Sequence, residues 1–179
     1  MRYYSTKGDS GTTSFGRGEK ASKAEASIEF VGALDEAQVA LGFAATEADK
    51  LKLDEVYQCL TWIQQTIFFA GTVIMGTATA EFQAGWSWDE QLAEVESMCE
   101  SFAPKEPLQA FVLPGGSELA ARIELARVAI RRLERSYCRA YDGDCGGLDA
   151  LPFFNRLSSL AFVLARRSNE ILEVSELTL

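Results

Sequence analysis

Histidine is absent from this 179-residue sequence. Its absence excludes a Ser-His-Asp triad, a Cys-His nucleophile pair, histidine-ligated zinc and the Glu-x-x-His di-iron site of some helical bundles. Residues 8–11, GDSG, match the nucleophile segment of trypsin-like proteases. Without a general base, however, Ser10 has nothing to activate its hydroxyl group. The sequence therefore excludes the hydrolases and metalloproteins that depend on histidine.

Paired cysteines and long apolar runs are missing as well. Cys59, Cys99, Cys138 and Cys145 are scattered and form no CxxC motif, which predicts ordinary thiols rather than disulfides. No stretch reaches the roughly 18 uninterrupted apolar residues of a membrane span, and the first residues lack the apolar run of a secretory signal. We expect a cytoplasmic protein with no membrane partner.

Basic residues are in the minority. Lys and Arg number 17 against 26 Asp and Glu, and the net charge of −9 argues against a nucleic-acid partner, because phosphate contacts need a basic surface. Four prolines and no long polar tract leave no obvious linker, and a composition that is 47% hydrophobic suits one sizeable core. The sequence predicts a single domain, 1–179, with an N-terminal loop at 1–24 and a helical bundle at 25–179.

The periodicity of the apolar residues predicts the fold class. Helical spacing covers residues 24–48, where Val39 is expected on the inward face, and residues 51–79 and 151–172. Residues 88–101 predict a shorter acidic helix. Four long helices, one short one and no convincing strand pair predict an all-α, antiparallel four- or five-helix bundle of the up-and-down, ferritin-like type.

The fourth long helix follows a turn. Residues 111–113 are expected to be extended and to run into Pro114-Gly115-Gly116, after which Ser117 is a suitable N-cap. Glycines at 143, 146 and 147 are expected to break the chain after this helix.

Arginines concentrate on this helix. Six lie between Arg122 and Arg139, and Arg127, Arg131 and Arg135 are spaced four residues apart, which aligns them along one side. They would repel one another unless carboxylates or anions lie between them. One interpretation is a solvated, partly ion-paired helix face. The other is a polyanion site, because guanidinium groups bind phosphate oxygens in a bidentate manner.

Residues 6–13, TKGDSGTT, suit the same ligand. Glycines let the backbone approach a ligand, while amides, hydroxyls and a lysine can cradle phosphates. A flexible terminus is the alternative interpretation. Two phosphate-suited elements far apart in the sequence favour a polyanion site more than either element alone. Asp35 is either part of a polar face or a partner for one of the arginines, and Asn155 offers an amide for a base or a phosphate.

Four segments together resemble the PduO-type ATP:cob(I)alamin adenosyltransferases, in the right order and across nearly the whole chain. They are YSTKGDSGTT at 4–13, GALDE at 32–36, FVLPGGS at 111–117 with the arginine helix to RRLER at 131–135, and NRLS at 155–158 with FVLAR at 162–166. Ile63-Gln64 and Gly71 also fit. The stretch from FVLPGGS to RRLER is the most specific part of the resemblance.

The resemblance implies a function: transfer of the 5′-deoxyadenosyl group of ATP to Co(I) of a reduced corrinoid such as cobalamin. It also implies a homotrimer with ATP sites between subunits, Mg²⁺ held mainly through the ATP phosphates with no separate protein metal site, a flavin-type reductase and a cobalamin-dependent acceptor enzyme. Phe111 would lie beneath the corrin ring and keep a lower axial ligand off cobalt, and Asp35 would pair with Arg127 on the corrinoid side, so these three are the candidate catalytic residues. The implied ATP-binding residues are Thr6, Lys7, Gly8, Asp9, Gly11, Thr12, Thr13, Lys23, Arg131, Glu134, Arg135 and Asn155.

Four positions depart from the family pattern. Ser159 stands where an acidic residue usually follows the NRLS segment, and Glu124 replaces a usual histidine in the arginine helix. Lys20 stands for an arginine, and Gln38 for an asparagine. The missing carboxylate at 159 would leave an arginine uncompensated, and Glu124 could restore the balance from another helix.

Two further functions share these features. A non-catalytic trimer that binds ATP and a corrinoid, as a sensor or carrier of adenosylcobalamin, would use the same N-terminal loop. A plain helical bundle for protein interaction would require both phosphate-suited segments to be accidental.

Overall fold

The computed structural model describes residues 3–16, 18–105, 110–141 and 149–179. Glycines 143, 146 and 147 and Cys145 lie outside the described residues. Within the described part the protein is mostly helical, with six helices and a single two-stranded antiparallel sheet. None of the described helices has the length and apolar character needed to cross a membrane. The elements are β1 (Thr12–Phe15), β2 (Glu19–Ser22), α1 (Ala26–Lys50), α2 (Asp54–Ile74), α3 (Ala80–Gly85), α4 (Trp88–Ser101), α5 (Glu118–Tyr141) and α6 (Leu151–Ile171).

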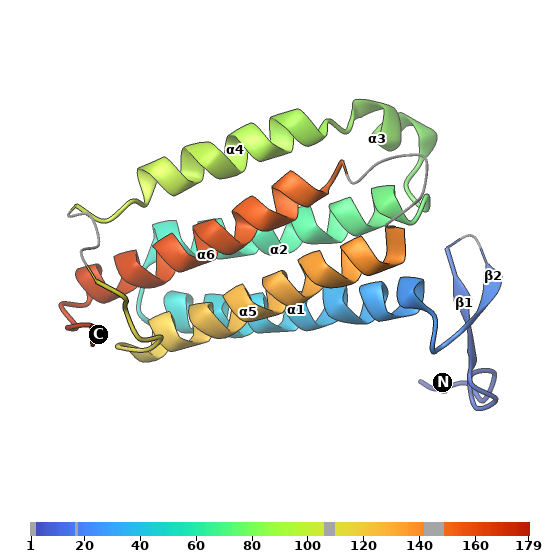
Figure 1. Cartoon of the computed structure of the whole chain (residues 1–179), viewed down its shortest axis with the longest axis horizontal. Coiled ribbons are helices and arrows are strands. Elements are labelled where there is room, and N and C mark those ends of the chain that lie inside the picture. Colours follow the sequence, from blue (N-terminus) through green and yellow to red (C-terminus); the bar gives the residue numbers. More distant parts are fainter. Residues whose placement is uncertain (1–2, 17, 106–109, 142–148) are drawn as a thin grey trace.

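The four long helices form a bundle in which α1 packs against α2 and α5, and α6 packs against α5 and α4 (Figure 1). Two ion pairs fix the direction of α5 relative to α1: Arg122 near the start of α5 contacts Glu47, and Arg132 contacts Glu29. The two helices are therefore antiparallel. This arrangement confirms the predicted all-α bundle.

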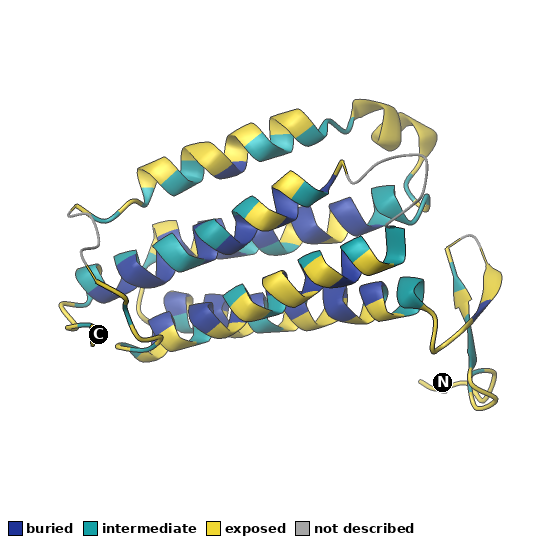
Figure 2. Ribbon diagram, in the orientation of Figure 1, coloured by how far each residue is buried: buried dark blue, intermediate teal, exposed yellow. Residues whose placement is uncertain are grey.

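The core lies between these helices, where the buried residues face one another (Figure 2). The apolar stripe of α5, formed by Leu119, Ile123, Ala126, Ile130 and Leu133, is fully buried, and so are Val56, Leu60, Ile63 and Ile67 of α2. The prediction for Val39 is wrong, because its side chain is 66% exposed. The buried face of α1 is narrow and rich in alanine, so Val39 falls on its outer side. The core side of α1 is formed by Phe30, Ala33, Leu34, Ala37, Leu41, Ala44, Ala45 and Ala48.

Glycine allows α1 and α2 to approach closely. A Cβ atom on Gly71 would lie 2.9 Å from Cδ1 of Leu34, closer than real side chains pack. The Nε2 of Gln64 donates to the carbonyl of Gln38, 3.0 Å away, and so joins the same two helices. The helix predicted over 51–79 ends early, at Ile74, because Gly76 adopts a positive φ of 63°. A separate short helix, α3, follows and was not predicted.

The N-terminal segment corrects the sequence-based prediction of a loop without strands. β1 and β2 pair in antiparallel register, with Thr13 opposite Ala21 and Ser14 opposite Lys20. Each strand has only four residues, too few to produce a recognisable alternation of apolar and polar residues. Gly16 and Gly18, with φ of 53° and 102°, lie in the connection between them. In Figure 1 this hairpin stands beyond the N-terminal end of α1.

The Pro-Gly-Gly turn is fixed to α6 by one asparagine. Asn169 accepts a hydrogen bond from the Ser117 amide at 2.8 Å and donates to the Gly115 carbonyl at 3.0 Å. A Cβ on Gly116 would lie 2.4 Å from the side-chain nitrogen of Asn169. The φ of Gly116, 95°, also favours glycine. The Ser117 hydroxyl accepts from the Ala120 amide at 3.1 Å, which confirms the predicted N-cap.

Candidate functional site

The hairpin encloses a cleft of about 630 Å³ that is lined by hydroxyls, backbone and two lysines. Four of the predicted ATP-binding residues line it: Lys7, Gly8, Thr12 and Thr13. Three further lining residues were missed: Ser5, Ser14 and Lys20. Ser14 and Lys20 are opposite each other in the strand register, so only the unpredicted hairpin could have revealed them. The composition of the cleft suits an anionic ligand with many acceptor oxygens.

The other predicted loop residues are joined to one another by backbone contacts. The Asp9 amide donates to the Thr6 carbonyl at 3.2 Å, and the Lys23 amide donates to the Gly11 carbonyl at 2.9 Å. Gly11 has a φ of 82°, a conformation that favours glycine. The Lys23 ammonium lies against Gly8, where a Cβ would be 3.1 Å from Nζ. The structure thus brings the predicted loop residues together.

The arginines of α5 divide into two groups. Arg122 contacts Glu47 and Glu118, and Arg132 contacts Glu29 and Glu36. Arg131, by contrast, is exposed and forms no ion pair with any described residue. The Arg135 guanidinium only donates to the Arg131 carbonyl, at 2.9 Å. The ion-paired face is thus confirmed for some members, while the polyanion site stays a prediction for the exposed Arg131 and Arg135.

Beside this free charge lies a carboxylate that α6 orients. The Asn155 Nδ2 donates to the Glu134 carboxylate at 2.9 Å, which joins the C-terminal half of α5 to the start of α6. Arg131, Glu134 and Arg135 lie within one turn of α5, next to Asn155 at the start of α6, and we call these four residues the arginine seam. The combination of two cations, one carboxylate and one amide suits a nucleotide triphosphate with a bound divalent cation.

Arg127 has a different partner from the one expected. Its Nε lies 2.5 Å from the Glu124 carboxylate, and the other oxygen of Glu124 is 3.0 Å from Nη1 of Arg166 on α6. Asp35 is exposed on α1 and forms no ion pair with any described residue. The pair between Asp35 and Arg127 is therefore absent within one chain. Glu124 contacts both arginines, and compensation for the missing carboxylate at Ser159 stays a prediction.

Phe111 stands at the edge of the fold. Phe111 is 84% exposed, so its aromatic ring gains no stabilisation from burial within one chain. The predicted extended segment is confirmed, because Val112 forms an antiparallel bridge with Thr178. The C-terminal tail lies at the end of the bundle away from β1 and β2 (Figure 1). Within one chain, the residues expected to bind ATP phosphates and the residue expected to face the corrin ring are therefore at opposite ends.

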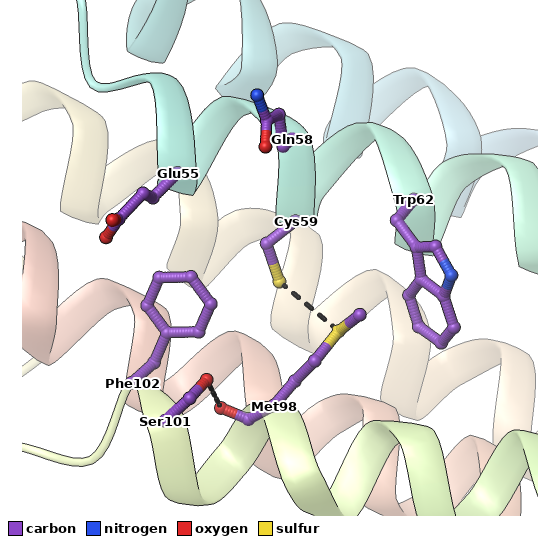
Figure 3. A pocket seen from close by; sticks show the side chains of 7 residues that line it. All are labelled: Glu55, Gln58, Cys59, Trp62, Met98, Ser101 and Phe102. Carbon is purple, nitrogen blue, oxygen red and sulfur yellow. Dashed lines mark hydrogen bonds between the residues drawn. The ribbon is translucent and has the colours of Figure 1, made fainter.

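A second hollow was not predicted and carries no catalytic group. It has a volume of about 560 Å³ and lies between α2 and α4 (Figure 3). Its central thiol, Cys59, lies 3.9 Å from the sulfur of Met98. Burial, with a smaller contribution from Cys99, raises the pKa of the Cys59 thiol to about 12, so it stays protonated and is a poor nucleophile. Cys59 and Cys99 are free thiols, as predicted. The lining residues are Glu55, Gln58, Cys59, Trp62, Met98, Ser101 and Phe102.

The two phosphate-suited elements do not meet within one chain. Among the described residues, no hydrogen bond or ion pair joins residues 3–24 to Arg131, Glu134, Arg135 or Asn155. Also among the described residues, no three carboxylate, cysteine or histidine side chains converge as a metal site. The site residues therefore form two partial surfaces, each with unsatisfied charge.

Comparison with known proteins identifies the family. Residues 3–168 match the family model described as cobalamin adenosyltransferase. A corrinoid adenosyltransferase of Mycobacterium tuberculosis is 33% identical over 94% of this chain and 89% of its own length. The corrinoid adenosyltransferase PduO of Salmonella typhimurium is 30% identical over 98% of this chain, which spans 54% of that protein.

A solved structure shares the fold. It is a variant of the PduO-type ATP:corrinoid adenosyltransferase from Lactobacillus reuteri complexed with cobalamin and ATP, with a TM-score of 0.83 and 22% identity over 99% of this chain and 96% of that one. The family match covers the hairpin, the arginine seam and most of α6. This chain belongs to the cobalamin adenosyltransferase family.

Proposed function

We propose that this protein transfers the 5′-deoxyadenosyl group of ATP to the cobalt of a reduced corrinoid. In this reaction the electron pair of Co(I) attacks the ribose 5′ carbon, the Co–C bond forms, the C–O bond breaks, and triphosphate leaves with the bonding electrons. The observation that carries the proposal is the unpaired Arg131 beside the Glu134–Asn155 contact, in a chain of this family. A net charge of −9 makes such free cations informative.

The protein contributes positioning and charge, because the nucleophile belongs to the corrinoid. Lys7, Lys23 and Arg131 would neutralise the negative charge that grows on the triphosphate as it leaves. The hydroxyls of Thr12 and Thr13 would orient its oxygens. No general base is needed, which agrees with a sequence without histidine.

Magnesium fits this arrangement through the phosphates. Mg²⁺ keeps most of its waters and commonly binds one or two carboxylates together with substrate phosphates. Glu134 is half-buried, is held by Asn155, precedes Arg135 directly and lies three residues after Arg131. It is the carboxylate that we assign to the hydrated magnesium of MgATP.

We further propose that the working form is a homotrimer with sites between subunits. Asp35 lies on the exposed side of α1, and Arg127 faces α6 through Glu124, so the two can pair only between copies. Such a contact joins two different surfaces and forms a ring when its rotation closes, and we propose that it closes with three copies. The same step would bring the hairpin of one copy to the arginine seam of the next. We also propose that the protein is cytoplasmic and that it works with a reductase and with a cobalamin-dependent acceptor enzyme.

Spectroscopy tests the function directly. Purified protein with ATP, magnesium and chemically reduced cobalamin should show the absorption change of Co–C bond formation and release one triphosphate per corrinoid. ATP binding without that change would favour a sensor or carrier. Absence of any ATP-dependent rise in melting temperature would favour a plain interaction module.

Phe111 gives a narrower test of the corrinoid side. Because its ring is exposed, Phe111→Ala should change stability by less than about 0.5 kcal/mol and leave ATP binding intact. It should depress turnover that starts from Co(II), since an axial ligand could then reach cobalt and make reduction harder. Unchanged turnover from Co(II) would remove the role that we assign to Phe111.

A further inference from the structure

The C-terminal tail, residues 172–179, holds the segment that carries Phe111. The Leu113 amide donates to the Leu177 carbonyl at 2.8 Å, and the Leu179 amide donates to the Phe111 carbonyl at 2.9 Å. With the bridge between Val112 and Thr178, these contacts make a short antiparallel pair. Phe111 has little other support, because its ring is exposed. Its position therefore depends on where the tail lies.

One carboxylate fixes the tail to the bundle. Glu176 forms an ion pair with Arg166 and accepts a hydrogen bond from Nδ2 of Asn169 at 2.7 Å. Arg166 is only 3% exposed, and among the described residues neither its Nη2 nor its Nε, which is in ion-pair contact with Glu176, has a hydrogen-bond partner. A buried guanidinium needs carboxylate partners to offset its lost hydration. Arg166 therefore binds the tail through Glu176 on one side and α5 through Glu124 on the other.

These groups form a chain of alternating charge: Arg127, Glu124, Arg166 and Glu176. The steps are 2.5 Å from Arg127 to Glu124 and 3.0 Å from Glu124 to Arg166, and Arg166 contacts Glu176 directly. Two positive and two negative charges leave the chain neutral, which suits its burial. It runs from a proposed catalytic residue on α5 to the tail that bridges to Phe111.

We propose that Glu176 is a positioning residue that sets the place of Phe111 through the tail, and that the ionic chain keeps Phe111 and Arg127 in fixed relation. This inference rests on the proposed function, because it assigns Phe111 and Arg127 to the same reaction. Glu176 itself touches no substrate. Its carboxylate acts by anchoring residues 177–179, and their backbone holds residues 111–113.

The test compares Glu176→Gln with Glu173→Gln. Both changes remove one negative charge from the tail, but Glu173 is exposed and has no ion pair with any described residue. In Glu176→Gln, hydrogen exchange at the Leu113 amide should accelerate about tenfold or more, because the tail opens more often. Turnover that starts from Co(II) should fall about tenfold, while KM for ATP stays within about twofold of the parent. Glu173→Gln should match the parent protein.

Two results would overturn the inference. One is unchanged exchange at Leu113 in Glu176→Gln, and the other is faster exchange with unchanged turnover from Co(II). If Glu176→Gln fails to fold, a variant without residues 177–179 provides the test. This deletion keeps the ionic chain and removes only the bridge to residues 111–113. The same loss of Co(II) turnover then supports the inference, and normal turnover overturns it.

The exchange measurement also separates this inference from the proposed function. If the parent protein forms no Co–C bond, the proposed function fails, yet exchange at Leu113 still reports whether Glu176 holds the tail. If the parent is active and Glu176→Gln behaves like Glu173→Gln, only the positioning role fails.

Discussion

Arg127 and Arg131 are one helical turn apart on α5, but they differ in what surrounds them. Glu124 neutralises Arg127, whereas Arg131 has no carboxylate partner in the described part of the chain. An unpaired guanidinium on an exposed helix face stays hydrated and can bind phosphate oxygens. The same residue type is therefore ion-paired at one position and unpaired at the next.

Arg131→Ala should weaken ATP binding without weakening the fold. Loss of one charge-assisted contact to a phosphate should lower affinity about tenfold, because such contacts contribute about 1.5–3 kcal/mol. Titration calorimetry with MgATP measures this effect. Arg156→Ala is the matched control, because Arg156 follows Asn155 in sequence but is paired with Glu96 on α4. Equal affinity in the two variants would contradict the assignment of Arg131.

Glu124 is the residue whose loss should harm stability most. It is 5% exposed and contacts two arginines, so Glu124→Gln leaves Arg127 without a carboxylate and Arg166 with Glu176 alone. We expect a loss of about 3 kcal/mol in the free energy of unfolding, and a fall in Tm of roughly 6–12 °C. Glu118→Gln, at an exposed ion pair on the same helix, should change Tm by far less.

Addition of Ser159→Glu to Glu124→Gln tests the compensation between the two positions. Asn155, Ser159 and Arg166 share one face of α6, since their spacings of four and seven residues are close to whole helical turns. A carboxylate at 159 would therefore face the arginine seam of α5 and restore part of the lost Tm. A double variant no more stable than Glu124→Gln would show that the two positions are not equivalent.

At the scale of the elements, the helices were predictable and the hairpin was not. Long apolar stripes identify α2 and α5 because each buries one broad face in the core. β1 and β2 are short and mostly exposed, so burial leaves little pattern in their sequence. Phosphate-suited residues could still be recognised there by composition. Their arrangement, with Lys20 across from Ser14, required the strand register.

The candidate site shows the same division. The residue types at the seam of α5 and α6 were predictable, because free arginines are unusual in an acidic chain. The partner of Arg127 was not, since Glu124 and Asp35 are both plausible carboxylates until the packing of α5 is known. Val39 failed for a related reason: periodicity marks an apolar position but does not say whether the chain's own core or another surface covers it.

Gly8 tests the hairpin as a binding element. Its missing side chain lets Lys23 Nζ lie against the backbone, and a Cβ would approach that ammonium to 3.1 Å. Because Nζ ends a flexible side chain, Gly8→Val should displace the ammonium with little effect on the melting temperature. ATP affinity should fall about tenfold because the Lys23 ammonium moves away from the loop at Gly8. Gly85→Val, at a glycine with open space around it, provides the comparison; a similar loss of affinity there would contradict this account.

The whole molecule presents an apolar outer face that a trimer would cover. Four apolar residues are exposed there: Val39 and Phe43 on α1, and Leu125 and Val128 on α5. The Arg122 guanidinium on α5 lies 3.9 Å from the centre of the Phe43 ring and so joins the two helices at this face.

Val39→Glu should break the trimer into monomers, because a charge would be buried without a partner at the interface. Light scattering after gel filtration measures the mass. Adenosyl transfer should fall with the trimer, because the hairpin and the arginine seam do not meet within one chain. Leu51→Glu, at an exposed apolar residue after α1, should leave both mass and activity unchanged. A fully active Val39→Glu monomer would place the complete site within a single chain.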